Sequence, residues 1–564
     1  MRKQREKDNN IRRSGANIMA SLILLLGSLA YIMVLAVLNG SVGFLCAMGV
    51  TLSGAVGIAK TLGENIALSY GAIITLAIVC GIFRGLLRYL EQYSNHYIAF
   101  RLLAVLRDNI FTALRRLCPA KLENKQKGNI IAMITSDIET LEVFYAHTIS
   151  PICIAVVVSA CVLCFVGTVS SWWLALVALV GYVMVGIAIP MISAGKLKES
   201  GVCYRAEFAS FNAYFLDSIK GIKDIVLHNA AENRTAEVNC RSEKLLKETK
   251  RMKHDITKAA ATTELCVSVF IIGTLAVGIF LVTEDMLTVS RMLIGVVAVF
   301  GSFGPVIAIS ALPGNLTQTF AAGDRVLNLL SEKPVVYPVE KGKDFVFDNL
   351  EVKNLSFSYD GQLQILSDIC MQAKKGEIIG IVGESGCGKS TLLKMLLRFW
   401  QKSNGEILYN GEDIDAVDSD SLLKNVTMVS QTTYLFDETI EENLRVAKPD
   451  ATMEELEEAC KMASIHDFIL TLPKGYQSRV GVLGDNLSAG EKQRIGLARA
   501  FLRGSDLILL DEPTSNVDSI NEGIILKALQ EQKKQKSIIL VSHRESTLSV
   551  ADRIYHMEGG KLCA

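Results

Sequence analysis

A full match to the phosphate-loop pattern G-x-x-x-x-G-K-[ST] lies at Gly383-Glu384-Ser385-Gly386-Cys387-Gly388-Lys389-Ser390-Thr391. An apolar, β-branched run precedes it and a second apolar run follows it, so we expect a buried strand, a glycine loop and a helix in that order. Glycines let the backbone approach a phosphate chain closely, and the N–H groups at the start of the helix face the anion. Lys389 is expected to place a positive charge at the β/γ-phosphates, and the Ser390 hydroxyl to bind Mg²⁺. The alternative is an ordinary glycine turn before a helix, which the motifs described below disfavour.

The composition differs between the two parts of the chain. Of its 564 residues, 50% are hydrophobic and only 21% are charged, which is too apolar for a soluble enzyme. The apolar residues crowd into the first part, whereas Lys, Glu and Asp gather in the last. The net charge is zero, so nothing in it suggests a nucleic-acid partner. We therefore predict a multi-domain membrane protein: an all-α transmembrane domain at 1–322, a linker at 323–344 and an α/β P-loop nucleotide-binding domain at 345–564.

Six apolar segments are long enough to cross a bilayer as helices, namely 18–38, 66–83, 149–169, 172–192, 266–282 and 292–312. A further apolar stretch at 42–58 contains several Gly and Ser residues. We interpret this stretch as an outer extension of the first two helices, with a seventh span as the alternative. The first segment follows a basic N-terminus, as in a signal peptide, but its length and the lack of a small-residue cleavage site favour a membrane span.

The distribution of Lys and Arg predicts how the spans are oriented. Basic residues are concentrated in the N-terminal tail and in the stretches 84–137 and 196–253, and they are scarce in the intervening loops. By the positive-inside rule, the tail and both stretches are cytoplasmic, and so is the nucleotide site. Both stretches keep helical periodicity, so we expect membrane helices that continue into the cytoplasm, with short elbows at 119–128 and 218–224. The prediction is a multi-pass protein of the cytoplasmic membrane, embedded in the lipid bilayer.

The 13 cysteines are scattered without the paired spacing of a metal site. Cys161 and Cys164 lie inside an apolar run. Buried, reduced membrane cysteines are therefore expected in preference to a zinc or redox site.

Polar residues that follow strand-like runs are suited to phosphoryl transfer. One buried run ends in Asp511 and Glu512; Asp511 is expected to hold Mg²⁺, and Glu512 to orient and deprotonate the attacking water. Gln431 offers an amide to the metal or the water, and His543 offers an imidazole to a γ-phosphate. Tyr359, ahead of the phosphate loop, offers a ring face to adenine. Each residue taken alone is more often structural, and it is their joint order that indicates a nucleotide site.

A second phosphate-binding loop is indicated at Leu487-Ser488-Ala489-Gly490-Glu491, because a helical run follows it. The whole motif set now resembles that of an ATP-binding-cassette (ABC) nucleotide-binding domain: Tyr359, Gly383 to Thr391, Gln431, Leu487 to Glu491, Asp511-Glu512, Ser515 to Asp518 and His543. With six spans ahead of it, the chain resembles an ABC half-transporter of the exporter fold over essentially its whole length.

This resemblance implies an ATPase that exports a small solute, with ATP and Mg²⁺ as cofactors and with Glu512 and His543 as catalytic residues. The implied ATP-binding residues are Tyr359, Gly383, Glu384, Ser385, Gly386, Cys387, Gly388, Lys389, Ser390, Thr391 and Gln431. The implied Mg²⁺ ligands are Ser390, Gln431 and Asp511.

The resemblance also implies a dimer. In this family two cassettes pair head to tail, so Ser488, Ala489, Gly490 and Glu491 are expected to close over the ATP of a second half-transporter subunit. A heterodimer is favoured, and a homodimer is the alternative. Ala489 stands where the family usually has Gly, and Asn516-Val517 departs from the common pair before Asp518. Neither departure removes a catalytic group, so the site is expected to hydrolyse ATP.

A narrower resemblance concerns the loop between the second and third spans. It is similar to that of the CydC-like thiol-exporter subunit of cytochrome bd assembly in Arg88-Tyr89-Leu90-Glu91, His96, Phe100-Arg101, Leu106-Arg107, Pro119-Ala120, Gly128 and Ser136-Asp137, with Ser150-Pro151 beyond. That resemblance implies a thiol substrate, such as cysteine or glutathione, or one related to haem. His96 is a candidate ligand for haem iron, and a histidine that makes a structural hydrogen bond is the alternative.

Two classes of function follow from these patterns. One is a pump that couples ATP hydrolysis to export, and the other is a binding and gating device in which ATP opens a channel or regulates a partner. Glu512 and His543 are both present, which favours the pump. Multidrug, lipid or peptide export remains the alternative for the substrate.

Overall fold

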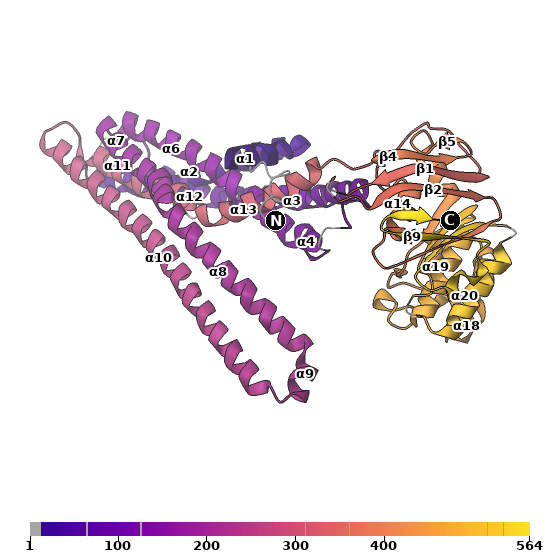
Figure 1. Cartoon of the computed structure of the whole chain (residues 1–564). Helices are drawn as coiled ribbons and strands as arrows, with labels where there is room; N and C mark the ends of the chain where they lie inside the picture. Colours follow the sequence, from indigo (N-terminus) through magenta and orange to yellow (C-terminus); the bar gives the residue numbers. More distant parts are fainter. Residues whose placement is uncertain are drawn as a thin grey trace. The chain divides into compact units, whose positions relative to one another are not determined.

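The computed structural model describes residues 13–63, 66–123, 127–310, 312–359, 361, 363–515, 517–533 and 535–563 (Figure 1). The basic tail up to residue 12 and Asn516, on which the sequence makes predictions, lie outside these ranges. The chain divides into two compact units: one ends at Glu332, and the other comprises Leu117–Glu123 and Lys333–Ala564. The change between units therefore falls within the stretch 323–344 that the sequence predicts as a linker. The elbow at Leu117–Glu123 belongs to the unit that contains the phosphate loop.

The first unit is built from helices, and six helical stretches among its described residues are long and apolar enough to cross a membrane. These are Ala30–Thr61, Tyr70–Leu117, Gly128–Val169, Trp172–Lys220, Ala231–Thr283 and Val289–Ser310. The α-helices are α1 (Gly15–Leu24), α2 (Ala30–Thr61), α3 (Tyr70–Leu117), α4 (Lys127–Ala132), α5 (Ile138–Phe144), α6 (Ser150–Val169), α7 (Trp172–Val183), α8 (Ile189–Lys220), α9 (Ile222–Leu227), α10 (Ala231–Thr283), α11 (Val289–Ser302), α12 (Gly304–Ser310) and α13 (Pro313–Ser331). Short π-helical turns, η2 (Met133–Asp137), η3 (Tyr145–Ile149) and η4 (Met184–Ala188), join several of them. The predicted all-α membrane domain with six spans is confirmed.

The first span lies further along the chain than the sequence predicts. The helix α1 is a separate element, and the chain turns at Gly27, whose φ of +46° is not helical. The spanning helix α2 then runs from Ala30 to Thr61. The stretch 42–58 is therefore most of the first span and not an outer extension of it. Hydropathy misplaces this span because the sequence stays apolar across the non-helical turn between α1 and α2.

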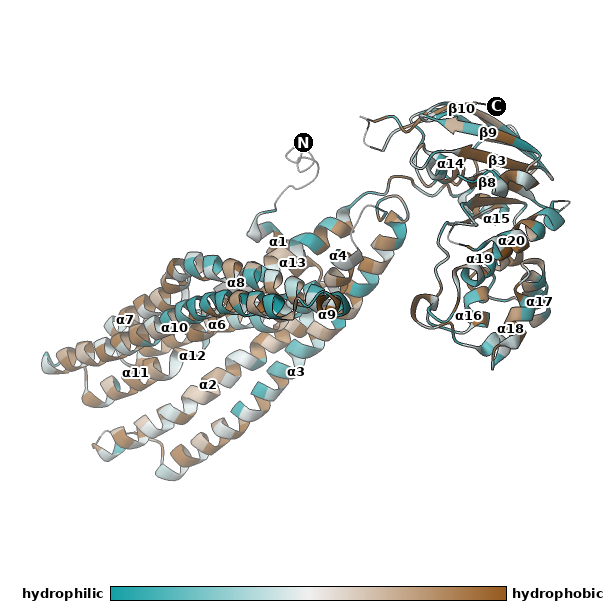
Figure 2. Ribbon diagram, turned by 60° about the horizontal axis from the view of Figure 1, so that its bottom comes forward, coloured by the Kyte–Doolittle hydropathy of each residue, from teal (hydrophilic) through white to brown (hydrophobic). Residues whose placement is uncertain are grey.

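The helices α8 and α10 form a long antiparallel pair that is joined at one end by α9 (Figure 1). The pair is mostly hydrophobic near α7 and α11 and becomes hydrophilic toward α9 (Figure 2). This change confirms that the membrane helices continue as polar extensions. The predicted elbow at 218–224 is the turn at Gly221 together with the start of α9.

The sequence predicts buried cysteines in the apolar run of α6, but the structure shows two of them exposed. Cys161 and Cys164 are free and exposed on this helix. The buried side of α6 is a stripe at every fourth residue, Ile154, Val158, Val162 and Val166, and neither cysteine falls on it. The described residues contain no group of three or more His, Cys, Asp or Glu side chains that could hold a metal ion.

The second unit contains two sheets and the helices that pack on them. A six-stranded sheet has the order β10-β9-β3-β8-β7-β6, and a four-stranded antiparallel sheet has the order β2-β1-β4-β5. The strands are β1 (Asn349–Phe357), β2 (Leu366–Lys374), β3 (Ile378–Gly383), β4 (Asn404–Tyr409), β5 (Glu412–Asp413), β6 (Val426–Val429), β7 (Leu507–Asp511), β8 (Ser537–Ser542), β9 (Arg553–Glu558) and β10 (Lys561–Cys563). The helices are α14 (Lys389–Leu396), α15 (Ser419–Asn425), α16 (Ile440–Arg445), α17 (Met453–Met462), α18 (His466–Thr471), α19 (Ala489–Arg503) and α20 (Ser519–Gln532). The predicted α/β domain is confirmed.

Candidate active site

The candidate site lies where four parallel strands end. In the larger sheet, β3 pairs in parallel with β8, β8 with β7, and β7 with β6. Their carboxyl ends therefore lie at one edge of the sheet, which is where α/β proteins bind ligands. The phosphate loop follows β3, Gln431 follows β6, Glu512 follows β7 and His543 follows β8. The topology thus brings four separate sequence motifs to one edge.

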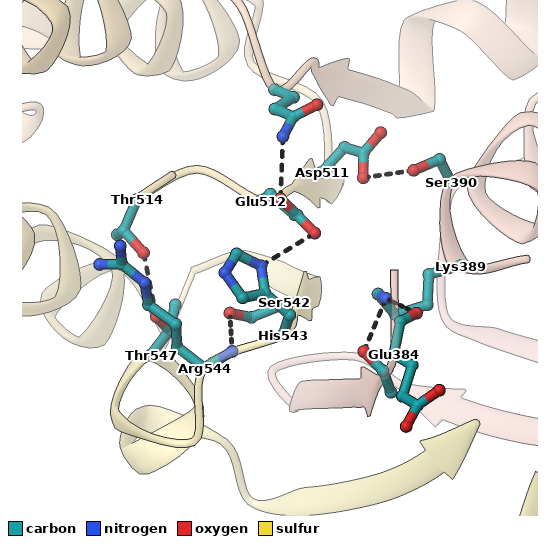
Figure 3. A network of polar contacts seen from close by, with 12 residues as sticks. Glu384, Lys389, Ser390, Asp511, Glu512, Thr514, Ser542, His543, Arg544 and Thr547 are labelled. Atoms are coloured by element: carbon teal, nitrogen blue, oxygen red, sulfur yellow. Dashed lines mark hydrogen bonds and ion pairs between the residues drawn. The ribbon is translucent and has the colours of Figure 1, made fainter. Parts of the chain in front are cut away.

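The phosphate loop has the backbone that its glycines predict. Gly386 and Gly388 have φ values of +86° and +111°, which side-chain-bearing residues rarely adopt. A Cβ atom on Gly388 would also lie 3.0 Å from the carbonyl oxygen of Ile365. Lys389 begins α14 and is buried, and its Nζ donates to the carbonyl oxygens of Gly383 (2.8 Å) and Glu384 (2.7 Å) (Figure 3). The ammonium group is therefore held over the loop.

Ser390 and Asp511 form a pair of oxygen ligands at the same edge. The Ser390 hydroxyl donates to Asp511 Oδ1 at 2.8 Å (Figure 3). Burial raises the pKa of Asp511, which is only 7% exposed, while the Ser390 hydrogen bond opposes that shift. A buried carboxylate beside a hydroxyl is a donor set that suits Mg²⁺, which prefers oxygen ligands and would compensate the buried charge.

Glu512 is held from both sides. Its Oε2 accepts from Gln431 Nε2 at 2.9 Å, and its Oε1 lies 3.1 Å from His543 Nδ1 (Figure 3). Glu512 also has a φ of +48°, an unusual conformation for a residue with a side chain, which costs on the order of 1–3 kcal/mol. The structure therefore places Gln431 and His543 on Glu512. Among the described contacts, Gln431 makes none with Ser390 or Asp511.

Tyr359 lies beside the start of α14. Its hydroxyl is 3.0 Å from Thr391 Oγ1, and the residue is 38% exposed, so part of its ring stays accessible. The ring packs edge-to-face against Trp400, with 4.8 Å between ring centroids. The sequence analysis missed Trp400, although a large aromatic residue soon after the phosphate-loop helix was a signal that could have indicated it.

The loop Ser488–Glu491 is organised by its own helix cap. Its residues cap α19: the Ser488 hydroxyl accepts from the Glu491 N–H, and Glu491 Oε2 accepts from the Ser488 N–H. Gly490 packs so closely that a Cβ atom would lie 2.9 Å from Asn521 Cγ. Among the described contacts, Ser488 and Glu491 make no hydrogen bond with the phosphate loop or with Glu512.

Comparisons with known proteins agree with this architecture. Residues 18–306 match the family model described as the ABC transporter transmembrane region, and residues 366–515 match the model described as ABC transporter. A "Probable ABC transporter ATP-binding/permease protein" from Haemophilus influenzae is 48% identical over 98% of this chain and 100% of the relative.

The chain belongs to the ABC transporter family.

Two further similarities describe this ABC transporter more closely. The "Putative multidrug export ATP-binding/permease protein YgaD" from Bacillus subtilis is 31% identical, over 85% of this chain and 83% of the relative. The solved "Structure of a bacterial Atm1-family ABC exporter with ATP bound" shares the fold, with a TM-score of 0.79, 24% identity, and coverage of 96% of this chain and 95% of that one. The chain is therefore a multi-pass ABC transporter subunit of the exporter fold, with ATPase activity coupled to transport. The half-transporter fold implies that it works as a dimer.

The membrane unit of the transporter contains two adjoining cavities with charged side chains in their walls, which the motifs did not reveal. Two cavities of about 190 and 270 Å³ share Phe44, Arg88 and Glu91 in their walls. Glu91 is 2% exposed, and both of its carboxylate oxygens accept from Arg88 Nη1, at 2.9 and 2.8 Å. The other lining residues come from α2, α3, η3, α6 and α12: Gly40, Gly43, Ala47, Arg84, Gln92, Ala146, His147, Pro151, Ile154, Pro305 and Ala308. Ionisable side chains within spanning segments commonly mark a substrate path.

His96 lies one turn beyond the larger cavity on α3. Its ring is 5.6 Å from that of His147, which does line the cavity, and 6.0 Å from that of Phe100. Asn95, the residue before His96, is 1% exposed, and its Oδ1 has no hydrogen-bond partner among the described residues. The sequence does show Arg84, Arg88 and Glu91 close behind an apolar run. Hydropathy gives no indication that their side chains line the same cavity.

Proposed function

We propose that this chain is one half of an exporter whose ATP site is built from the residues at the carboxyl edge of its larger sheet. Lys389 and the N–H groups of residues 383–391 bind the phosphates, and Tyr359 contacts the adenine. Glu512 acts as the general base for the attacking water, and His543 contacts the γ-phosphate. The observation that carries the proposal is the contact of Glu512 with both Gln431 and His543, beside the Ser390–Asp511 pair.

Mg²⁺ would be held by Ser390 and Asp511, with Gln431 as a further ligand. The first two are already 2.8 Å apart, and Asp511 is buried, whereas Gln431 would need to turn its amide from Glu512 toward the ion. The ion would supply positive charge for the phosphate oxygens. The chain's own residues do the rest: Lys389 orients the phosphates, and Glu512 orients the water and removes its proton.

The decisive experiment on the chemistry is Glu512→Gln in the purified transporter. The amide keeps the size and hydrogen-bonding capacity of the carboxylate but removes the base, so ATP binding should survive while hydrolysis falls by roughly 10²-fold or more. Gln431→Ala is the matched comparison, because it removes a partner of Glu512 but not the base, and should have a smaller effect. Undiminished hydrolysis in Glu512→Gln would overturn the assignment.

The dimer is proposed to place the loop Ser488–Glu491 of each subunit over the phosphate loop of the other. This arrangement accounts for a loop that caps α19 but, among the described residues, makes no hydrogen bond with the phosphate loop of its own chain. Cysteines introduced at Ser385 and Ser488 should crosslink between subunits in a homodimer, and the crosslink should increase with Mg-ATP in the Glu512→Gln background. An ATP-independent crosslink would contradict the arrangement.

We favour a heterodimer of two different half-transporters, in the cytoplasmic membrane, with the ATP-binding domains on the cytoplasmic side. The support is the narrower sequence resemblance and the concentration of basic residues in 84–137 and 196–253. Purification of this chain expressed alone tests the point: a stable dimer with full ATPase activity would instead indicate a homodimer. A protease that cleaves the second unit from outside sealed cells would overturn the orientation.

For the substrate, we propose a small charged solute, either a thiol such as cysteine or glutathione or a compound related to haem. The cavity walls offer Arg84 and Arg88 beside Glu91, and this mixture of charges suits a zwitterion better than an apolar drug. Inverted vesicles should accumulate labelled glutathione or cysteine when ATP is supplied, and not with a non-hydrolysable analogue. Accumulation with the analogue would instead indicate a gated channel.

Multidrug export is the second candidate, and it is favoured by the name of the Bacillus subtilis relative. Ethidium efflux from cells that express wild type or Arg88→Ala distinguishes multidrug export from thiol export. If the cavity selects charged thiols, the rate of ethidium efflux should be the same in both.

A haem-related substrate is tested separately by adding haemin to the detergent-solubilised protein. The Soret change should be reduced in His96→Ala and less so in Phe100→Ala, the matched control. Identical changes in wild type and His96→Ala would rule out His96 as a haem ligand.

A further inference from the structure

The ATP-binding domain contains one buried carboxylate to which the proposed chemistry gives no role. Glu522 lies in the first turn of α20 and is 9% exposed. Burying a carboxylate is costly unless hydrogen bonds or an opposite charge compensate it. The groups that compensate Glu522 therefore indicate what it holds in place.

The hydrogen bonds of Glu522 come from two different loops. Its Oε1 accepts from Thr547 Oγ1 at 2.8 Å and from Ser546 Oγ at 3.2 Å, and Thr514 Oγ1 lies 3.5 Å away. Thr514 and Thr547 are themselves buried, and their hydroxyl oxygens are 2.9 Å apart. The carboxylate thus fixes the segment after β7 against the segment after β8.

Each segment lies directly after a residue of the proposed reaction site in the chain. Thr514 follows Glu512 closely along the chain, and Arg544 directly follows His543. Arg544 Nη1 lies 3.6 Å from Glu522 Oε2, and the Arg544 N–H donates to the Ser542 hydroxyl at 3.0 Å. Figure 3 shows Thr514, Thr547 and Arg544 next to Glu512 and His543.

Glu512 needs such external support. A left-handed conformation at a residue with a side chain persists only where the surrounding structure imposes it. Gln431 and His543 hold the end of its side chain. On the backbone, Glu512 N–H donates to the Val541 carbonyl at 2.9 Å, and its own carbonyl accepts from Ser515 N–H at 3.1 Å. The segment containing Ser515 is the one that Glu522 anchors through Thr514.

We propose that Glu522 is a positioning residue for ATP hydrolysis, which sets the placement of Glu512 relative to His543 by fixing the two loops together. Its described hydrogen bonds and ion pair go to Thr514, Ser546, Thr547 and Arg544, and it acts through these neighbours. The proposal rests on the roles proposed above for Glu512 and His543.

Steady-state ATPase kinetics of Glu522→Ala, Glu522→Gln and Thr547→Val test this role. Glu522→Ala should lower kcat by about 10-fold or more while KM for ATP stays within about 2-fold, because only the alignment of the water is disturbed. Glu522→Gln keeps an oxygen acceptor for Thr547 and should recover most of the loss. Thr547→Val removes one hydrogen-bond donor at nearly constant volume and should be intermediate.

Lys527→Ala, on the same helix, is the matched control. The Lys527 side chain is 79% exposed and its ion pair with Glu531 is also exposed, so the pair contributes little, and kcat should stay near that of the wild type. Equal losses of kcat, ATP affinity and melting temperature in Glu522→Ala and Thr547→Val would show a purely structural role and overturn the proposal. Wild-type kcat in Thr547→Val would also overturn it, even if Glu522→Ala fails to fold.

A double-mutant cycle separates this proposal from the one it rests on. If Glu522 acts through Glu512, adding Glu522→Ala to Glu512→Gln should lower the residual turnover by less than about 2-fold, because residues that act as a unit are not additive. A full further loss would contradict positioning while leaving the role of Glu512 intact. Wild-type turnover in Glu512→Gln alone would instead refute the proposed catalytic site.

Discussion

Glu123 Oε1 lies 2.9 Å from Lys394 Nζ, so an ion pair joins the elbow after α3 to the helix that begins at the phosphate loop. Both residues belong to the second compact unit. Their side chains are 32% and 23% exposed, so the pair contributes only about 0.2–1 kcal/mol to stability. Its importance is its location, since the elbow is continuous with a membrane-spanning helix.

Reversing one charge of this pair should weaken the coupling of transport to hydrolysis. In Glu123→Lys, two ammonium groups face each other, so we expect ATP-driven transport to fall several-fold while ATPase activity without substrate changes little. The ratio of transported solute to hydrolysed ATP in proteoliposomes measures this. The exchange Glu123→Lys with Lys394→Glu should restore the ratio. Glu531→Lys, in the exposed pair with Lys527, is the matched control and should have no effect. A coupling ratio unaffected by Glu123→Lys would show that the pair plays no part.

Lys389→Ala should weaken ATP binding as well as turnover. Hydrogen bonds to charged groups are worth about 1.5–3 kcal/mol, which corresponds to a loss of affinity of roughly 10- to 100-fold. Equilibrium binding of a fluorescent ATP analogue measures it. Cys387→Ala is the control, because the Cys387 thiol is 3.8 Å from Lys389 Nζ and the loop is expected to bind phosphate through its backbone. Unchanged affinity in Lys389→Ala would count against the phosphate role.

Arg88→Ala should destabilise the membrane unit more than Glu91→Ala. Removing Arg88 leaves Glu91, with a side chain 3% exposed, without its counter-charge, at a cost of about 3 kcal/mol. In Glu91→Ala the charge of Arg88 stays solvated, because its side chain is 56% exposed. We therefore expect the free energy of unfolding to fall by only about 1 kcal/mol. Thermal unfolding in detergent gives the order. Arg101→Ala, at an exposed position further along α3, should be neutral. The reverse order would mean that Glu91 has a different counter-charge.

Gly490→Ala should reduce ATPase activity by about 10-fold or more, because the new methyl group displaces the loop that we propose to face the partner's ATP. The methyl group would lie 2.9 Å from Asn521 Cγ, and Asn521 cannot easily yield because it is bonded to Asp518 and Arg494. Gly523→Ala is the matched control, since nothing lies within 4 Å of its added Cβ. Equal activity in the two variants would contradict this account of Gly490.

The nucleotide site could be predicted from the sequence because its parts sit at positions that the strands determine. Asp511, Glu512 and His543 end or follow buried runs, so the order of the strands was sufficient to bring them to one edge. Their mutual contacts could not be predicted. Gln431 was expected to offer its amide to the metal or to the water, and in this structure the amide donates to Glu512.

The membrane unit was harder to predict, for two physical reasons. Hydropathy measures transfer into lipid and not backbone conformation, so it could not detect the turn at Gly27 or the true start of α2 at Ala30. The cavity that contains Arg88 and Glu91 is formed by helices that are distant in the sequence. These two residues share its wall with His147 only because the helices pack together. The exposed cysteines of α6 were misjudged for the same reason, since an apolar run does not say which face is covered.

The length of α10 has a mechanical consequence. A helix of 53 residues is about 80 Å long, at 1.5 Å per residue, and α8 packs along much of it. If the paired helices move together as one rigid rod, a tilt of the rod by about 5° moves its far end by about 7 Å. The tip of the rod carries α9, where Ile222, Val226 and Leu227 are exposed. A movement of a few ångströms at this tip therefore corresponds to only a small rotation of the spanning helices. Large displacements at α9 would thus accompany small changes in the packing of the helices that surround the substrate path.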